Sequence, residues 1–151
     1  MAFLYISNTN KKNILSSIDS ENYFHLGLSP KGGNRLKMFT FMAALGYNQG
    51  YPSNLEGGKD SFIREEYVRE ASDRFKFSAL YYAHCEKEHK SELGNVIQAD
   101  VVYPIIDRYA NTGFSVISDY MKRFTEKELA YKLIGEMDEM YDRFIQDFPE
   151  E

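Results

Sequence analysis

The run from His84 to His89 is the densest group of side chains in the chain that could hold a metal ion. If this run is helical, Cys85 and His89 lie four residues apart and share one face of the helix. A zinc site needs four ligands, usually supplied by two such pairs. Cys85 is the only cysteine, however, and the remaining histidine, His25, is distant in the sequence. We therefore interpret the run as a charged helix end and expect no cofactor, with Cys85 and His89 as the candidate ligands of any metal.

Nucleophilic catalysis needs a nucleophile, a base and an orienting group within reach of one another. Cys85 beside His84 or His89 is the only such pairing, and the sequence contains no Gly-x-Ser-x-Gly elbow. Adjacent residues of a helix point apart, and a lone helical cysteine usually behaves as a small buried apolar residue. The pattern therefore indicates a protein that is not an enzyme.

Glycine and basic residues gather at Lys31-Gly32-Gly33-Asn34-Arg35, just before a predicted helix. The free N–H groups at a helix N-terminus attract anions, and Lys31, Arg35 and Lys37 would add positive charge. The glycine spacing differs from that of a Walker A loop. Residues 1–50 carry five basic and two acidic side chains, so this part of the chain is locally basic. Two interpretations stay open: an anion or nucleic-acid contact at Lys31, Arg35 and Lys37, or a plain turn with solvated lysines.

The string Tyr109-Ala110-Asn111-Thr112-Gly113-Phe114 interrupts an apolar helical pattern. Such breaks in local preference tend to mark functional or strained sites. The structural alternative is a helix kink in which Asn111 bonds the freed backbone groups. Gly113 costs up to about 1 kcal/mol inside a helix, so it indicates either a helix break or a close neighbour.

Composition limits the function classes further. The chain has 151 residues and a net charge of −5, enough for one domain but of the wrong sign for a generally basic DNA-binding surface. A single cysteine cannot form an internal disulfide, and the apolar start of the chain is too short for a signal peptide or a membrane span. We therefore expect a cytoplasmic protein that does not contact membranes. Twelve Tyr and eleven Phe predict either an aromatic core or a tyrosine-rich partner surface.

The hydrophobic spacing predicts helices from Arg35 onwards. Residues 35–45 form the first, with Asn34 as its N-cap and Gly46 as its C-cap. The last helix covers residues 126–148 and begins with a capping box from Thr125 to Glu128. Between them we predict a surface loop over 47–59, a short helix capped by Asp60, a helix from Ser72 or Asp73 to about Glu88, an extended Val101–Tyr103, and a helix over 104–124 that begins at Pro104.

These elements predict a mostly α single domain over residues 1–151. We expect a helical bundle over 35–148, in which helices near 35–45, 60–85, 104–124 and 126–148 pack around an aromatic core. Residues 1–34 form an irregular N-terminal segment laid against that core. This segment allows a short strand at Ala2–Ile6 and a short helix around Asn13–Ile18.

Two stretches, Lys37–Gly50 and Arg108–Phe114, resemble the small accessory proteins encoded with bacterial DNA phosphorothioation (Dnd) systems. Those proteins have a helix end similar to Phe-x-x-Ala-Ala-x-Leu-Gly-Tyr and a later string similar to Glu-Tyr-Ala-Asn-Gly-Gly. Here Arg108 occupies the acidic position and Thr112 that of the first glycine. The resemblance covers 21 of the 151 residues. It implies a non-catalytic component of a defence cassette against foreign DNA, working beside larger nucleases or ATPases.

We therefore expect an accessory subunit of an antiphage or DNA-modification-linked system that binds a larger protein. Its interaction residues would be Tyr109, Asn111, Phe114, Tyr47 and Tyr51, on an exposed tyrosine-rich surface. Two alternatives stay open: a small protein that contacts DNA through residues 31–37, and a phage or plasmid inhibitor of a host defence protein. The sequence also leaves a homodimer open.

Overall fold

The computed structural model describes residues 3–15, 33–68, 70–88 and 98–147, most of which are helical. The principal helices are α3 (Gly33–Gln49), α4 (Ala71–Lys87), α5 (Ala99–Arg123) and α6 (Glu126–Asp147). Shorter pieces are α1 (Asn8–Asn10), the π-helical turn η1 (Lys11–Leu15) and the 3-10 turn η3 (Glu65–Tyr67). Strands β1 (Phe3–Ser7) and β2 (Lys59–Arg64) form a two-stranded antiparallel sheet. The mostly α single domain that the sequence predicts is confirmed.

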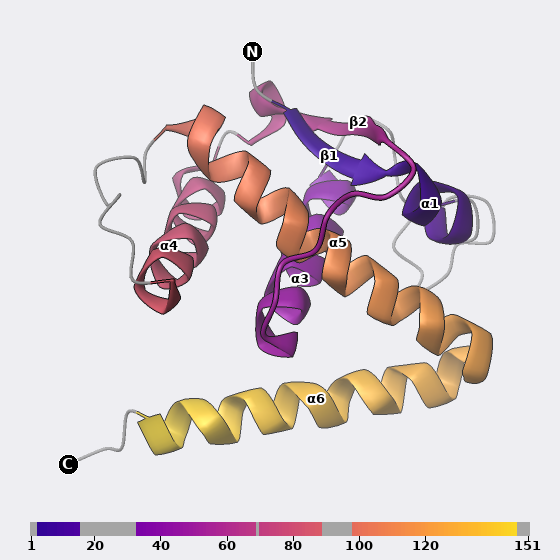
Figure 1. Cartoon of the computed structure of the whole chain (residues 1–151). Helices are drawn as coiled ribbons and strands as arrows, with labels where there is room; N and C mark the ends of the chain where they lie inside the picture. Colours follow the sequence, from indigo (N-terminus) through magenta and orange to yellow (C-terminus); the bar gives the residue numbers. More distant parts are fainter. Residues whose placement is uncertain (1–2, 16–32, 69, 89–97, 148–151) are drawn as a thin grey trace.

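Helix α5 runs through the middle of the molecule and contacts α3, α4, α6 and the sheet (Figure 1). Its contact with α3 is the most extensive between any two described elements. The helix begins at Ala99, so the prediction of an extended Val101–Tyr103 and a helix start at Pro104 is wrong. Pro104 lacks the N–H that would bond the carbonyl oxygen of Asp100. Because Pro104 lies close to the N-terminus of the helix, α5 continues despite the missing hydrogen bond.

The sheet corrects another prediction. Residues Lys59–Arg64 form a strand followed by a 3-10 turn, not a short helix capped by Asp60. The strand pairs with β1 from Phe3 opposite Arg64 to Ser7 opposite Lys59. Phe62 and Ile63 are adjacent and both buried. The strand forms here because it pairs with β1, a segment far away in the sequence. The predicted N-terminal strand is confirmed at Phe3–Ser7; Ala2, and residues 16–18 of the predicted short helix, lie outside the described residues.

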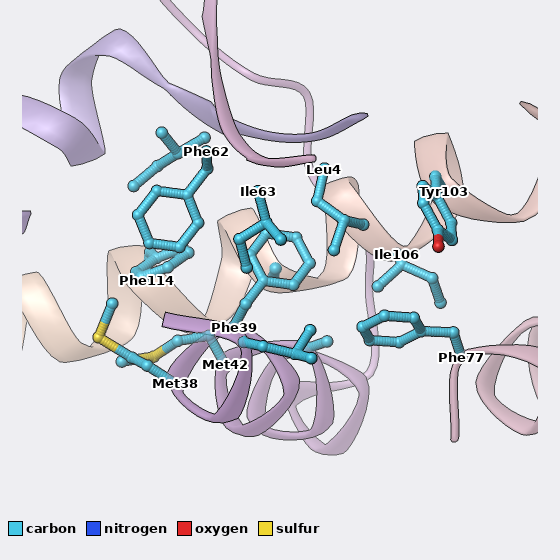
Figure 2. Close-up of a cluster of buried hydrophobic side chains, with 14 of the residues drawn as sticks. Leu4, Met38, Phe39, Met42, Phe62, Ile63, Phe77, Tyr103, Ile106 and Phe114 are labelled. Atoms are coloured by element: carbon cyan, nitrogen blue, oxygen red, sulfur yellow. The ribbon is translucent and has the colours of Figure 1, made fainter. Parts of the chain in front are cut away.

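The core is aromatic at its centre (Figure 2). The ring centroid of Phe39 lies 6.0 Å from that of Phe62, 6.4 Å from that of Phe77 and 6.2 Å from that of Phe114. The contacts of Phe39 with Phe77 and Phe114 are edge-on, and such contacts add to the free energy gained from burying the rings. Since these four residues come from α3, β2, α4 and α5, the cluster fastens the sheet and three helices together.

Helix α3 is longer than predicted. It begins at Gly33, one residue before the expected N-cap Asn34, and continues through Gly46 to Gln49. Gly46 is therefore not a C-cap. Gly50, with a φ of 100°, ends the helix in the left-handed conformation that glycine adopts without strain. The surface loop is confirmed in its middle but is shorter, because Tyr47–Gln49 are helical and Lys59 belongs to β2.

Helix α6 confirms the predicted capping box. The Thr125 N–H lies 3.2 Å from Glu128 Oε2, and the Glu128 N–H lies 3.3 Å from Thr125 Oγ1. The expectation that this helix packs around the core along its length is wrong. Leu129 is fully buried and Leu133 is half-buried, whereas most described side chains further along are exposed. Figure 1 shows α6 turning back beneath the other elements from its junction with α5; Phe148, at its predicted end, lies outside the described residues.

In the part of the chain that the structure describes, no helix has both the length and the apolar character needed to cross a bilayer.

Candidate functional site

The Tyr109–Phe114 string lies where α3 and α5 cross. A Cβ atom on Gly46 would lie 1.8 Å from the carbonyl oxygen of Tyr109, and one on Gly113 would lie 1.9 Å from the carbonyl oxygen of Met42. Only glycine lets the two backbones approach this closely. Helix α5 runs through Gly113 without a break, so the expectation of a close neighbour is confirmed and that of a helix kink is wrong.

Tyr109 and Phe114 are core residues. Their side chains are 0% and 1% exposed, so the prediction that they belong to an exposed interaction surface is wrong. Phe114 packs edge-on against Phe39 and Phe62 (Figure 2). The Tyr109 hydroxyl lies 2.8 Å from His84 Nδ1, and burial raises the pKa of Tyr109 to about 12. Helix α5 is covered by other elements on more than one side. The polar residues in its sequence therefore do not show which of its side chains are exposed.

Asn111 and Thr112 do build a polar site. Asn111 Nδ2 donates to Ser53 Oγ and to the carbonyl oxygen of Asn54, both at 2.9 Å. Thr112 Oγ1 lies 2.9 Å from Ser53 Oγ and 2.9 Å from the carbonyl oxygen of Tyr51. Two residues of α5 thus fix the loop over residues 50–58 against the helix. The Asn111 side chain therefore bonds residues far away in the sequence, and not the backbone groups of its own helix that the structural alternative expected.

The same site reaches the N-terminal segment. Asn10 Nδ2 donates to Asn111 Oδ1 at 2.7 Å and to Ser115 Oγ at 3.3 Å, and Ser115 Oγ donates to the Asn111 carbonyl oxygen at 2.9 Å. The sequence analysis missed Asn10, Ser53 and Ser115. No local pattern reveals them, since Asn10 and Asn111 are 101 residues apart and meet only after folding.

A cavity of about 300 Å³ opens at this network, and we call it the asparagine cavity. It lies between α1, the loop and α5. Its lining residues are Ser7, Thr9, Asn10, Tyr51, Ser53, Asn54, Glu56, Asn111, Thr112 and Ser115. Of the predicted interaction residues, Asn111 and Tyr51 line it, and Tyr51 is well exposed. Tyr47 is half-buried, with its ring centroid 5.5 Å from that of Tyr109.

One turn before Asn111, Asp107 is a buried carboxyl group on α5. Its Oδ1 accepts a hydrogen bond from the Tyr5 N–H at 2.9 Å, at the point where the register between β1 and β2 shifts. Burial raises the pKa of Asp107 to about 7, while the Tyr5 hydrogen bond and the charge of Lys59 oppose this rise. The carboxyl group therefore titrates near neutrality, and it ties the sheet to α5.

The basic candidates do not converge within the described residues. Arg35 is half-buried, with its guanidinium carbon 4.9 Å from the centroid of the Phe62 ring. Lys37 is exposed, and residues two apart on a helix do not share a face. Lys31 lies outside the described residues. Of the three basic candidates, Arg35 therefore lies over the aromatic ring of the core residue Phe62.

Of the two candidate metal ligands, Cys85 and His89, the structure describes only Cys85. Cys85 is buried, and His84 beside it contacts Tyr109. His89 lies outside the described residues. Among residues 3–15, 33–68, 70–88 and 98–147, no group of three or more His, Cys, Asp or Glu side chains is placed to hold a metal ion.

Among the described residues of α6, four large apolar side chains are exposed. Tyr131, Ile134, Met137 and Tyr141 are 64%, 53%, 53% and 63% exposed. On a helix these positions form one stripe beside the buried Leu129 and half-buried Leu133. We call it the α6 stripe. The helix over 126–148 was expected to pack around the core, but Met137 and Tyr141 face away from it.

A second cavity, of about 1150 Å³, lies beside α4, η3 and the start of α5. Its walls are mostly apolar and include the exposed rings of Phe75 and Tyr82. The cavity has room for apolar groups. Its rings of Phe75 and Tyr82 are exposed aromatic surface among the described residues.

Comparison of the chain with protein-family models, with curated proteins and with solved structures gave no match.

Proposed function

We propose that the chain is a non-catalytic interaction subunit that binds a larger protein through the α6 stripe. The exposed side chains of Tyr131, Ile134, Met137 and Tyr141 carry this proposal. Soluble proteins rarely leave several large apolar side chains together in water unless the patch binds something. An amphipathic helix that presents its apolar side to a groove is a common mode of protein recognition.

Charge favours a basic partner over a second copy of the chain. Helix α6 carries seven acidic and three basic residues, so two copies packed through it would bring like charges together. The exposed Asp138 and Glu139 follow directly after Met137. The partner that complements this surface has an apolar groove with Lys and Arg at its rim.

The setting we propose is a bacterial antiphage or DNA-modification-linked defence system. Support for it comes from the likeness of Lys37–Gly50 and Arg108–Phe114 to the accessory proteins of phosphorothioation systems. In such a system the larger partner is a nuclease or an ATPase component. The accessory subunit contributes a docking helix, and the catalysis belongs to the partner.

The test is native mass spectrometry of tagged protein isolated from the cells that make it. We expect a stoichiometric complex with a larger protein that is lost in the double variant Ile134→Ser, Met137→Ser and kept in Glu139→Ser, which alters the polar side of the same helix. Loss of the complex in the control as well, or retention in the double variant, would contradict docking through the stripe. A homodimer that dissociates in the double variant would show that the α6 stripe binds a second copy of the chain. A monomer without any bound protein would contradict the proposal.

A further inference from the structure

The hydrogen bonds around the asparagine cavity use up the donors of its central network. Both N–H groups of Asn111 and both of Asn10 are donated within the site. The hydroxyl groups of Thr112 and Ser115 are directed at backbone carbonyl oxygens, those of Tyr51 and Asn111. A ligand that reaches the side chains of this central network therefore meets acceptors there.

Asn10 supplies the most informative of these acceptors. The residue is only 4% exposed and lines the cavity, yet its Oδ1 accepts no hydrogen bond from any residue that the structure describes. Since Asn10 lines the cavity, this amide oxygen can accept a hydrogen bond from a donor group bound there.

Charge and shape narrow the ligand further. Glu56 is the only acidic or basic residue among those that line the cavity. A carboxylate repels phosphates and other carboxylates and attracts cations. The exposed ring of Tyr51 stands at the same cavity and offers a flat face on which a planar cation can stack.

We propose that the asparagine cavity binds the guanidinium group of an arginine side chain in a polypeptide. A guanidinium has five donors and no acceptor, which matches a cavity that presents acceptors. Glu56 balances its charge, Asn10 Oδ1 takes one of its N–H groups, and Tyr51 covers its face. The site lies on α1, the 50–58 loop and α5, so it is separate from the α6 stripe and neither proposal depends on the other.

The test is an NMR titration of the ¹⁵N-labelled protein with N-acetyl-arginine amide. We expect saturable shifts of the Asn10 and Asn111 side-chain amides, and much smaller ones with N-acetyl-citrulline amide, which has the same shape without the charge. N-acetyl-lysine amide tests whether any cation suffices. Glu56→Gln and Tyr51→Ala should weaken arginine binding about two- to fivefold each, since each removes one exposed interaction of moderate strength.

Matched controls are Glu86→Gln and Tyr82→Ala, which make the same changes at exposed positions outside the cavity. They should leave arginine binding unchanged. The proposal is overturned if the arginine probe causes no saturable shift, if the citrulline or lysine probe binds equally well, or if Glu86→Gln weakens binding as much as Glu56→Gln does.

Discussion

Gly113 of α5 lies directly against the backbone of Met42 in α3, with 1.9 Å between the carbonyl oxygen of Met42 and the place a Cβ would occupy. Gly46 of α3 stands in the same relationship to Tyr109 of α5. The two stretches that carry the family resemblance therefore meet at one helix crossing. The two glycines in these stretches determine how closely the two helix backbones pack. The polar site beside the crossing depends on that packing.

Replacing either glycine by alanine should destabilise the fold strongly. We expect Gly46→Ala and Gly113→Ala each to lower the free energy of unfolding by about 3 kcal/mol or more, because a backbone atom blocks the new methyl group and the helices must separate. Gly135→Ala in α6 is the matched control. No atom lies within 4 Å of its added Cβ, so better helix propensity should stabilise it by up to about 1 kcal/mol. Urea unfolding of the three variants checks this, and equal effects would contradict the close crossing.

Asn111 should be the residue that holds the 50–58 loop. Asn111→Ala removes the hydrogen bonds of the Asn111 side chain to Ser53 Oγ, to the Asn54 carbonyl oxygen and to Asn10 Nδ2, which should cost about 2–3 kcal/mol. Hydrogen exchange of the Ser53 amide, which donates to the Arg108 carbonyl oxygen, should accelerate with it. Asn8→Ala removes an exposed hydrogen bond to Gly57 of the same loop and should cost less than about 1 kcal/mol. If both variants behaved alike, the loop would not depend on Asn111.

Helical spacing was sufficient to predict α3, α4 and α6 and the mostly α class, because those signals are local. The strand at Lys59–Arg64 was missed because its partner β1 lies more than fifty residues earlier, and pairing overrides local preference. Of the residues of the polar site, only Asn111 and Tyr51 are among the predicted interaction residues. Asn10 and Ser53 have no distinguishing neighbours in the sequence, and they become site residues only where three distant segments meet.

Asp107 should make stability depend on pH near neutrality. Its folded pKa of about 7 lies above the ordinary value of 3.8, so between these values the folded state binds a proton that the unfolded state has released. The free energy of unfolding should therefore fall as pH rises from about 4 to 7 and level off above, by up to about 4 kcal/mol from this group.

Asp107→Asn isolates that contribution. The amide oxygen keeps the bond from the Tyr5 N–H but does not titrate, so the difference between wild type and variant should change across pH 4–7 in the stated direction. The measurement is urea unfolding at several pH values. Asp119→Asn, at an exposed position on the same helix, should leave the pH profile intact. A wild-type curve parallel to that of Asp107→Asn would show that the carboxyl group does not titrate in this range.

The contact between Tyr109 and His84 should contribute measurably to the core. Tyr109→Phe keeps the buried ring and removes only the hydroxyl that lies 2.8 Å from His84 Nδ1, which should cost about 1–2 kcal/mol. Tyr131→Phe makes the same chemical change at an exposed position and should be neutral within about 0.5 kcal/mol. Thermal unfolding of both variants measures the difference in stability between them. Equal stability of the two variants would show that the hydrogen bond between Tyr109 and His84 does not form in solution.

The two sides of α6 should respond differently to the loss of an apolar side chain. Leu129 is fully buried, so Leu129→Ala should lower the free energy of unfolding by about 2–5 kcal/mol. Ile134 is 53% exposed five residues later on the same helix, so Ile134→Ala should stay within about 0.5 kcal/mol of wild type. Urea unfolding measures both in the isolated chain. A cost at Ile134 comparable to that at Leu129 would mean that the chain itself already covers the α6 stripe, which would leave no apolar face for a partner; a large cost at Leu129 alone leaves the stripe open for docking.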